Sequence, residues 1–513
     1  MTIRSERYTR FSPLDPYNAN VWVNNNPFIT ADPVLLSRPQ LDDVQTLLPD
    51  PFWAGHTDAI ACYWKVWELA FQHIGQPTPE NGFVAPFIDT AFWYPGIFMW
   101  DSTFMMMFTR YGRRAFPFQG TLDNFYAKQH PDGFISRQIN HQTGADAFFR
   151  FDPVSTGPNI LGWAEWEYYR DTGDTERLAR VFPALVAYHQ WLRRYRTWPD
   201  GGYWTTGWGC GMDNQPRVPF TSEADLWMEH AHQVWADACL QQIFAARLLT
   251  QMAAALGRSA DIPDMAAEIE SLTEYVNCWL WDETSAFYYD ADCERRRLTT
   301  KSIGAYWALL ARTLSDTQVR RFTAHLNDPA TFNRPHRVPS LSADHPNYDP
   351  QGGYWMGGVW DPTNYMVLRG LTEVGQHGLA HEIGLNHVSN VTQVFKATGT
   401  VWENYAPDAA PRPGTPAKDD FVGWGGVGPV AGLLEYVFGL RADAPNNTLT
   451  WDVRLTDAHG VRRYPFGRTG WIDLRCERRD HTDERPQITA TSTVPLTLRV
   501  RWGDHVDTYD LQS

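Results

Sequence analysis

Apolar residues recur at helical spacing through most of the chain. In residues 56–74, Ala59, Tyr63, Val66 and Ala70 lie three or four positions apart, which predicts one buried helix face. The same spacing predicts further helices over residues 102–111, 122–128, 159–170, 176–196, 226–256, 264–280, 302–312, 316–325, 362–374, 378–394 and 427–438.

Long segments rich in Gly, Trp, Pro and Asn separate many of these predicted helices. Long loops in a compact domain usually carry function. A run of helices joined by such loops is typical of helix pairs that close into a ring. We therefore expect a mainly α fold, an (α/α)6 toroid barrel with functional loops gathered at one end.

The pattern changes to period two after residue 440. Leu449, Trp451 and Val453 alternate with polar residues, and so do Leu496 and Leu498. Such alternation predicts strands with one buried face. The expected domains are an irregular N-terminal arm (1–53), the catalytic barrel (54–440) and a small antiparallel β-sheet or sandwich appendage (441–513).

Charge and cysteine usage exclude several function classes. The net charge of −15 argues against nucleic acid or an anionic membrane as a partner. No apolar run approaches the roughly 20 residues of a membrane helix, and the polar N-terminus does not resemble a signal peptide. The six cysteines show no C-x-x-C spacing and the histidines are dispersed. We expect a cytoplasmic protein with no metal and no cofactor, whose oligomeric state the sequence leaves open.

Aromatic content indicates the kind of ligand. The chain has 24 Trp, 22 Tyr and 27 Phe, and many of the Trp residues stand beside Gly, Pro, Asp or Asn in turn-like segments. Indole rings on loops form good walls for the apolar face of a sugar, while carboxylates and amides bind its hydroxyls. A small carbohydrate is therefore the expected partner.

Two constellations carry an acid among aromatic residues. Asp101 opens a predicted helix beside Tyr94, Phe98 and Trp100. The purely structural alternative is that Asp101 only caps this helix. Asp213 follows Trp208 and two glycines that let the backbone bend sharply. The purely structural alternative is that Asp213 and Asn214 only form an Asx turn. Apolar shielding would raise the pKa of a carboxyl group and make it a usable general acid.

Two further constellations lie in the C-terminal part of the predicted barrel. Residues 353–365 form a Gly-rich loop that leads into a helix, and its Trp355 and Trp360 are candidate pocket walls. Glu403 lies between Trp402 and Asn404, and a segment rich in Pro, Ala and Asp (406–420) follows it. A glutamate in that setting is a candidate general base.

Two carboxylates on separate aromatic loops fit glycoside hydrolysis, because one acid protonates the leaving oxygen while a second carboxylate acts from the opposite side. Asp213 and Glu403 are the candidate pair. Since they lie far apart in the sequence, only the fold can bring them together.

The chain resembles glycoside hydrolase family 63, in particular its bacterial mannosylglycerate/glucosylglycerate hydrolase-like branch. The ordered motifs that carry the resemblance are Trp-Asp-Ser-Thr (100–103), Gly-Met-Asp-Asn-x-Pro-Arg (211–217), the Tyr-Trp to Asn-Tyr segment (354–365), Trp-Glu-Asn-Tyr (402–405) and Phe-Val-Gly-Trp (421–424). The chain departs from the family at Met356-Gly357-Gly358, where Arg-Gly-Pro is common, so a guanidinium able to form bidentate hydrogen bonds is missing.

The resemblance implies an inverting, exo-acting α-glycosidase that hydrolyses a small α-linked glucoside or mannoside. Asp213 would be its general acid and Glu403 its general base. Candidate substrate-binding residues are Tyr94, Phe98, Trp100, Asp101, Trp208, Asn214, Arg217, Trp355, Trp360, Asn404, Tyr405 and Trp424.

Other function classes fit parts of the pattern. A sugar epimerase/isomerase or polysaccharide lyase on the same barrel would use His or Tyr as a proton shuttle. His230 and His232, however, lie two apart in the predicted helix 226–256 and so face different sides. A non-catalytic sugar-binding protein would show binding without turnover.

Overall fold

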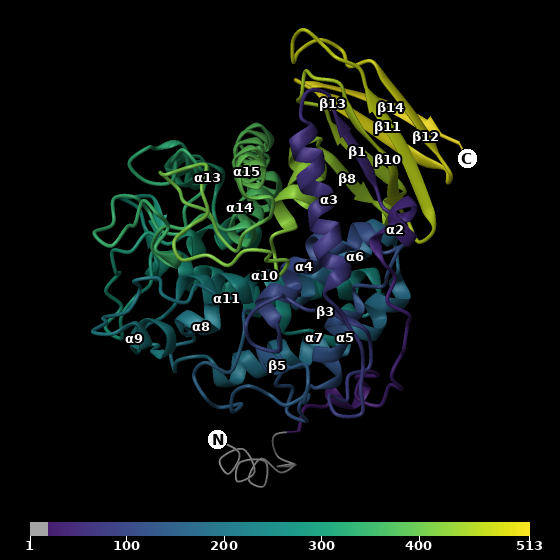
Figure 1. Cartoon of the computed structure of the whole chain (residues 1–513). Helices are drawn as coiled ribbons and strands as arrows, with labels where there is room; N and C mark the ends of the chain where they lie inside the picture. Colours follow the sequence, from purple (N-terminus) through teal and green to yellow (C-terminus); the bar gives the residue numbers. More distant parts are fainter. Residues whose placement is uncertain (1–18, 513) are drawn as a thin grey trace.

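Helices are the main regular structure in the part of the chain that the computed structural model describes, residues 19–512, and two sheets lie on one side of them (Figure 1). The helices are α2 (Leu41–Val44), α3 (Thr57–Gln72), α4 (Met99–Thr109), α5 (Gly120–Ala127), α6 (Leu161–Thr172), α7 (Thr175–Tyr195), α8 (Gly207–Cys210), α9 (Glu223–Met228), α10 (Ala236–Ala255), α11 (Met265–Trp279), α12 (Trp307–Ala311), α13 (Asp316–Ala324), α14 (Asp361–Glu373) and α15 (His377–Thr398).

Several of these helices pack in a closed order. Helix α4 contacts α6, α6 contacts α10, α10 contacts α12, and α12 contacts α14. Helix α14 then contacts the π-helical segment η8 (Val427–Val437), which returns to α4. Further helices pack against members of this set: α7 on α6 and α10, α11 on α10, α15 on α14, and α3 on η8. The mainly helical fold predicted from periodicity is confirmed.

A buried ionic cluster ties members of this closed set together. Arg110, at the end of α4, donates from Nε to Asp171 (2.7 Å) and from Nη2 to Glu435 of η8 (2.6 Å). Tyr365 of α14 donates its hydroxyl to the same Glu435 at 3.1 Å. All these side chains are buried, and such a cluster is maintained only when each charge is paired.

The single helix predicted over 226–256 is wrong. The chain forms α9, leaves helical geometry, and re-enters it as α10, because Ala231 (φ 50°) and His232 (φ 53°) adopt left-handed backbone conformations. Asp290 fixes the start of α10 by accepting a hydrogen bond from the Ala236 N–H at 2.8 Å. Apolar periodicity cannot reveal a break that a distant residue imposes. His230 and His232 therefore lie in a loop.

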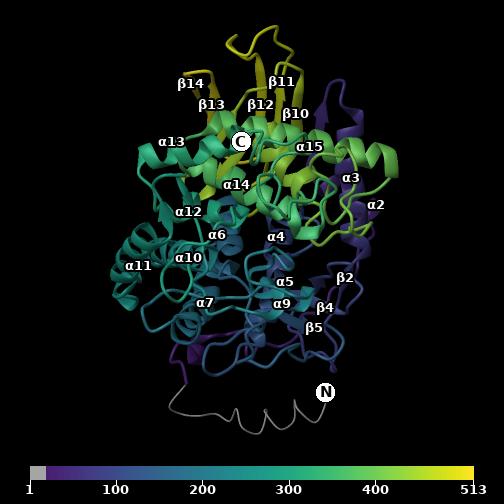
Figure 2. The same cartoon turned by 90° about the vertical axis from the view of Figure 1, so that its left-hand side faces the viewer.

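The strands include β1 (Asp50–Trp53), β8 (Leu440–Asp443), β9 (Thr448–Asp452), β10 (His459–Phe466), β11 (Gly470–Cys476), β12 (Ile488–Ser492), β13 (Leu496–Trp502) and β14 (His505–Leu511). Together they make two four-stranded sheets, in the orders β1-β10-β11-β12 and β14-β13-β9-β8. Both sheets lie against the same side of the helical part, as Figures 1 and 2 show. Short two-stranded pairings at β2 (Ile74–Gly75) with β3 (Phe87–Ile88), β4 (Gly96–Phe98) with β5 (Gln138–Asn140), and β6 (Trp281–Asp282) with β7 (Phe287–Tyr288) lie among the helices.

The C-terminal β region predicted from alternation is present, with two corrections. Strand β1 comes from the segment expected to be an irregular arm and pairs antiparallel with β10; residues 1–18 of that arm lie outside the described part. The second sheet is mixed rather than antiparallel, because β13 pairs with β9 in parallel. Long-range pairing of this kind leaves no mark on local periodicity. Among residues 19–512, no helix combines the length and apolar character needed to cross a membrane.

Candidate functional site

Asp101 stands in the first turn of α4. Phe98 occupies the N-cap position and makes no side-chain cap, so capping does not account for Asp101. A helix N-terminus favours a negative charge nearby. The neighbouring Trp100 is almost fully buried and places its indole edge-on to Trp355, with ring centroids 6.4 Å apart.

Asp213 lies just past α8, on a tight loop. Gly211 has a φ of +77°, and a Cβ at this position would lie 2.6 Å from Cδ2 of Trp100. Only glycine fits a left-handed conformation so close to a ring. The loop therefore brings Asp213 to the side of Trp100, next to the start of α4.

Glu403 is held at both carboxylate oxygens. Tyr354 donates its hydroxyl to Oε1 at 2.8 Å, and the Lys418 backbone N–H donates to Oε2 at 3.1 Å. The Glu403 backbone is fixed as well, because its N–H donates to the Lys418 carbonyl and its carbonyl accepts from the Trp424 indole (2.7 Å). Glu403 is 2% exposed. Both contacts at its side chain favour the ionised form.

Asp101, Asp213 and Glu403 share one electrostatic environment. Burial raises the pKa of Asp213 to about 6, against the opposing charge of Arg137. Burial, with the repulsion of Asp213, raises the pKa of Glu403 to about 7. Burial and the charges of Asp213 and Glu403 hold the pKa of Asp101 well above its usual range. The first turn of α4 and two loops therefore bring three acids together, and the pKa values of Asp213 and Glu403 are suited to proton transfer near neutral pH.

Arg137 is a site residue that the sequence analysis missed. Its Nη1 donates to the Trp208 carbonyl at 3.4 Å, and its guanidinium lies over the rings of Phe148 (4.7 Å) and Trp208 (5.3 Å). Burial lowers its pKa to about 10, although the charges of Asp213 and Asp101 oppose this. Its Nε has no hydrogen-bond partner. Arg137 stands outside every motif, so no sequence signal pointed to it.

Tyr354 was also missed, although it begins a motif that the sequence analysis singled out. Tyr354 and Gly353 both have left-handed backbones (φ 61° and 50°). A bulky residue in this conformation is unusual and is kept where the surroundings demand it. The result here is a phenol aimed at Glu403.

Trp355 and Trp360 form a stacked pair, with centroids 3.9 Å apart and ring planes 2° apart. Trp360 is fully buried, its indole N–H donates to the Tyr354 carbonyl, and it packs against Trp424. No surface of Trp360 is available to a sugar. We therefore replace the predicted wall role of Trp360 with support of the Tyr354–Glu403 pair, and the 1% exposure of Trp355 points the same way.

Arg217 and Asn214 are occupied by protein partners. The guanidinium of Arg217 forms buried ion pairs with Asp237 (2.5 Å) and Asp290 (2.7 Å). The Asn214 side chain accepts from the Trp355 N–H (2.8 Å) and donates to the Gly353 carbonyl (3.1 Å). Both residues fix loops around the site, so direct substrate contact is no longer expected of them.

The remaining predicted residues divide into buried and accessible groups. Asn404 and Tyr405 are fully buried; Asn404 donates to the Pro416 carbonyl at 3.0 Å and ties the 406–420 segment to the Glu403 loop. Phe98 and Trp208 are partly exposed, and Tyr94 is 48% exposed. Substrate contact stays a prediction for these three, for Trp100 and Trp424, and for Asp101.

Replacing Tyr354 by Phe is expected to raise the pKa of Glu403, because a donor to its carboxylate is lost. A hydrogen bond to a charged group contributes about 1.5–3 kcal/mol. The upper pKa of the Asp213–Glu403 pair, and with it the alkaline limb of the kcat/KM–pH profile, should therefore move to higher pH. Activity at pH 6 should fall at least about tenfold, because less of Glu403 is ionised. Tyr509→Phe, which removes a hydroxyl donor to Asp507 on β14, should leave the profile unchanged. An unshifted profile in Tyr354→Phe would contradict the assignment of Glu403 as a titrating group.

Replacing Arg217 by Met is expected to destabilise the fold, because Asp237 and Asp290 would be left buried without a counter-charge. Removing one partner of such a pair costs about 3 kcal/mol or more. Arg475→Met, which breaks an exposed pair with Glu477, should shift the unfolding midpoint much less, because solvent screens an exposed ion pair. Urea unfolding followed by tryptophan fluorescence compares the stability of the two variants. Equal unfolding midpoints for Arg217→Met and Arg475→Met would contradict a structural role for Arg217.

Comparison with known proteins places this site in a family. Residues 94–418, more than half of the chain, match the model of the mannosylglycerate hydrolase MGH1-like glycoside hydrolase domain. The mannosylglycerate hydrolase of Thermus thermophilus is 23% identical over 355 residues, 56% of this chain and 84% of that protein. An uncharacterized protein of Borreliella burgdorferi is 24% identical over 368 residues, 69% and 74% of the two chains.

Solved structures agree at the level of the fold. The crystal structure of the Thermus thermophilus GH63 mannosylglycerate hydrolase in complex with glucose aligns with a TM-score of 0.55 and 20% identity, covering 72% of this chain and 99% of that one. Together with the family match, this defines a carbohydrate-hydrolysing class. The chain belongs to glycoside hydrolase family 63, and it is an enzyme that hydrolyses glycosidic bonds.

Proposed function

We propose that the protein is an inverting, exo-acting α-glycosidase that hydrolyses a small α-linked glucoside or mannoside. The observation that carries the proposal is the unequal hydrogen bonding of the two acids. Both Glu403 oxygens accept hydrogen bonds, as a carboxylate base requires, whereas within residues 19–512 no other side chain donates to Asp213. A protonated Asp213 is then free to donate to the leaving oxygen. Because the pKa of Glu403 (about 7) lies above that of Asp213 (about 6), this active form is the minor singly protonated state of the pair.

In this mechanism Glu403 takes a proton from a water molecule as that water attacks the anomeric carbon. Asp213 gives its proton to the glycosidic oxygen, the C–O bond breaks, and the aglycone leaves as an alcohol. The sugar is released with inverted configuration, and the next cycle begins once Asp213 regains a proton and Glu403 loses one. Asp101 would bind sugar hydroxyls beside Trp100.

The substrate class rests on the relatives. The Thermus thermophilus relative is a mannosylglycerate hydrolase, and its crystal structure holds glucose; we carry a small gluco- or manno-configured substrate to this chain by analogy. Incubation with a panel of α- and β-linked disaccharides and glycosides tests this proposal. Release of a single monosaccharide from α-linked members is expected, and release from β-linked members alone would overturn it.

The proposed architecture is an (α/α)6 toroid over residues 54–440, followed by the β appendage 441–513. The closed order from α4 through α6, α10, α12 and α14 to η8 supports the toroid. We also propose a reducing compartment such as the cytoplasm, because all six cysteines are free thiols, Cys278 and Cys293 being exposed.

The kcat/KM–pH profile is expected to be bell-shaped, with its maximum between pH 6 and 7, because catalysis needs one proton on the Asp213–Glu403 pair. Below the pKa of about 6 the pair holds two protons and the base is lost; above about 7 it holds none and the acid is lost. These limbs belong to the pair rather than to either residue. A profile that stays flat from pH 5 to 8 would contradict this.

A further inference from the structure

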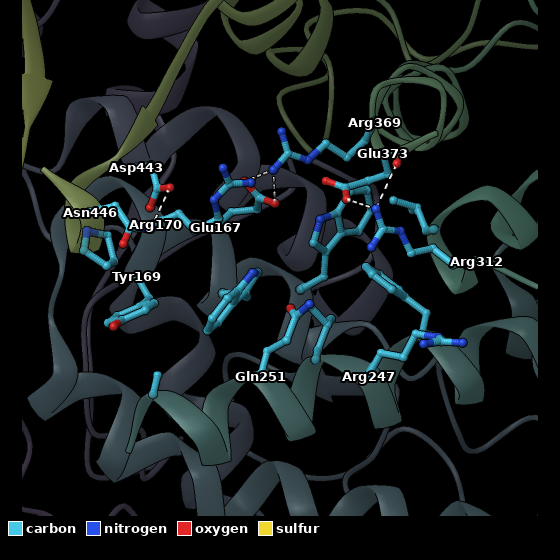
Figure 3. Close-up of a pocket in the computed structure, with 17 residues that line it drawn as sticks. Glu167, Tyr169, Arg170, Arg247, Gln251, Arg312, Arg369, Glu373, Asp443 and Asn446 are labelled. Atoms are coloured by element: carbon cyan, nitrogen blue, oxygen red, sulfur yellow. Dashed lines mark hydrogen bonds and ion pairs between the residues drawn. The ribbon is translucent and has the colours of Figure 1, made fainter. Parts of the chain in front are cut away.

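A cavity of about 430 Å³ lies along helices α6, α10 and α14 (Figure 3). Its lining includes Trp163 and Arg170 of α6, Arg247 of α10 and Glu373 at the end of α14. Neither Asp213 nor Glu403 lines it. The mechanism proposed above does not use these residues.

One wall of the cavity is aromatic. Trp163 of α6 and Phe244 of α10 meet edge to face, with centroids 5.7 Å apart, and Trp166 lines the cavity beside them. Trp163 and Phe244 are nearly fully buried, whereas Trp166 is partly exposed. Trp166 therefore offers an apolar surface of the kind that packs against a ring, and Trp163 and Phe244 lie buried beside it.

Two guanidinium groups lie on one side of the same cavity (Figure 3). Arg247 donates from Nε to the Ala311 carbonyl at 2.7 Å, and Arg312 donates from Nη2 to the Glu373 carbonyl at 3.1 Å. Within residues 19–512, no carboxylate lies within ion-pair distance of Arg247, and the Glu373 carboxylate is 4.0 Å from Arg312. Burial and the like charge of Arg312 lower the pKa of Arg247.

This pair differs from Arg369, another cationic group of the lining. Arg369 is neutralised by Glu167 through contacts of 2.7 and 2.9 Å. Arg312, in addition, has a left-handed backbone (φ 53°) at the end of α12, a position that glycine or asparagine usually takes. In a chain of net charge −15, two neighbouring guanidiniums with donors left over favour a doubly charged anion.

We propose that this cavity binds a phosphorylated monosaccharide, with the phosphate between Arg247 and Arg312 and the sugar ring against Trp166. A phosphate dianion balances the two cations and accepts several hydrogen bonds. The aromatic wall distinguishes a sugar phosphate from a bare phosphate ion. The site is separate from the Asp213–Glu403 pair, so its ligand is not a substrate.

Isothermal titration calorimetry with glucose 6-phosphate at fixed ionic strength tests the proposal. Arg247→Gln and Arg312→Gln should each weaken binding at least tenfold. Arg499→Gln, which removes an exposed charge from β13, should bind as the wild type does. Asp213→Asn should also keep the wild-type affinity, because the ligand does not enter the candidate active site. Arg247→Lys keeps the positive charge and controls for misfolding. Its affinity for glucose 6-phosphate should fall less than that of Arg247→Gln.

Three results would overturn the proposal: no binding to the wild type at millimolar concentration, unchanged affinity in Arg247→Gln, or loss of binding in Asp213→Asn. Titration with inorganic phosphate and with glucose separates the two parts of the ligand. Both should bind more weakly than glucose 6-phosphate. Equal affinity for inorganic phosphate would overturn the assignment of the sugar ring to the aromatic wall.

Discussion

Replacing Asp213 by Asn is expected to lower kcat/KM about 10³-fold on a substrate with a poor leaving group, while the protein stays folded. General acid catalysis contributes about 10²–10⁴-fold, and a carboxamide of nearly the same shape cannot supply the proton. Released reducing sugar gives the rate, and circular dichroism with thermal melting gives the fold. Asp504→Asn, in the exposed turn before β14, is the matched control and should behave as wild type.

The leaving group makes this prediction specific for an acid. A dinitrophenyl glycoside departs with little protonation, so Asp213→Asn should recover most of its lost activity on such a substrate. A purely structural defect would lower both rates equally. Equal losses on the two substrates, or wild-type activity on the first, would remove Asp213 from the role of general acid.

Replacing Glu403 by Gln is expected to cause a loss of about 10³-fold or more that does not depend on the leaving group, because the base acts on the water and not on the aglycone. The amide cannot accept the proton, although its oxygen can still accept from the Lys418 N–H and its NH2 group can donate to the Tyr354 hydroxyl oxygen. Comparison of kcat/KM on a substrate with a poor leaving group and on a dinitrophenyl glycoside measures whether the loss depends on the leaving group. Glu274→Gln, an exposed change on α11, is the control.

Azide separates a base from a nucleophile in the Glu403→Gln variant. In the inverting mechanism no glycosyl-enzyme forms, so added azide should give no glycosyl azide of retained configuration. Detection of that product by mass spectrometry and NMR would contradict the assignment. Persistence of near wild-type turnover would instead favour the epimerase or lyase alternative, which does not require Glu403.

Local pattern predicted the helices well where one buried face runs through a segment, as in α3. It failed where distant residues act. The continuous helix over 226–256 is broken by left-handed backbones at Ala231 and His232, and α10 starts where Asp290 captures an N–H. The pairing of β1 with β10 joins residues some 400 positions apart, and no periodicity encodes such a contact.

In the candidate site, too, local motifs predicted some features and missed those that depend on distant residues. Motifs identified Asp213 and Glu403 because acids on aromatic, glycine-rich loops have a recognisable chemistry. They did not distinguish a wall from a supporting layer: Trp360 is fully buried and Arg217 is fully paired. Arg137 and Tyr354 were missed because their importance comes from what they face, which only the folded chain determines.

The stereochemistry of hydrolysis tests the central claim most directly. Proton NMR of the purified protein with α-linked disaccharides and glycosides shows which anomer of the released sugar appears first, before mutarotation mixes the two. The account predicts the β-anomer, because water activated by Glu403 attacks from the face opposite the leaving group. An α-anomer that appears first would contradict inversion and make one of the two carboxylates a nucleophile.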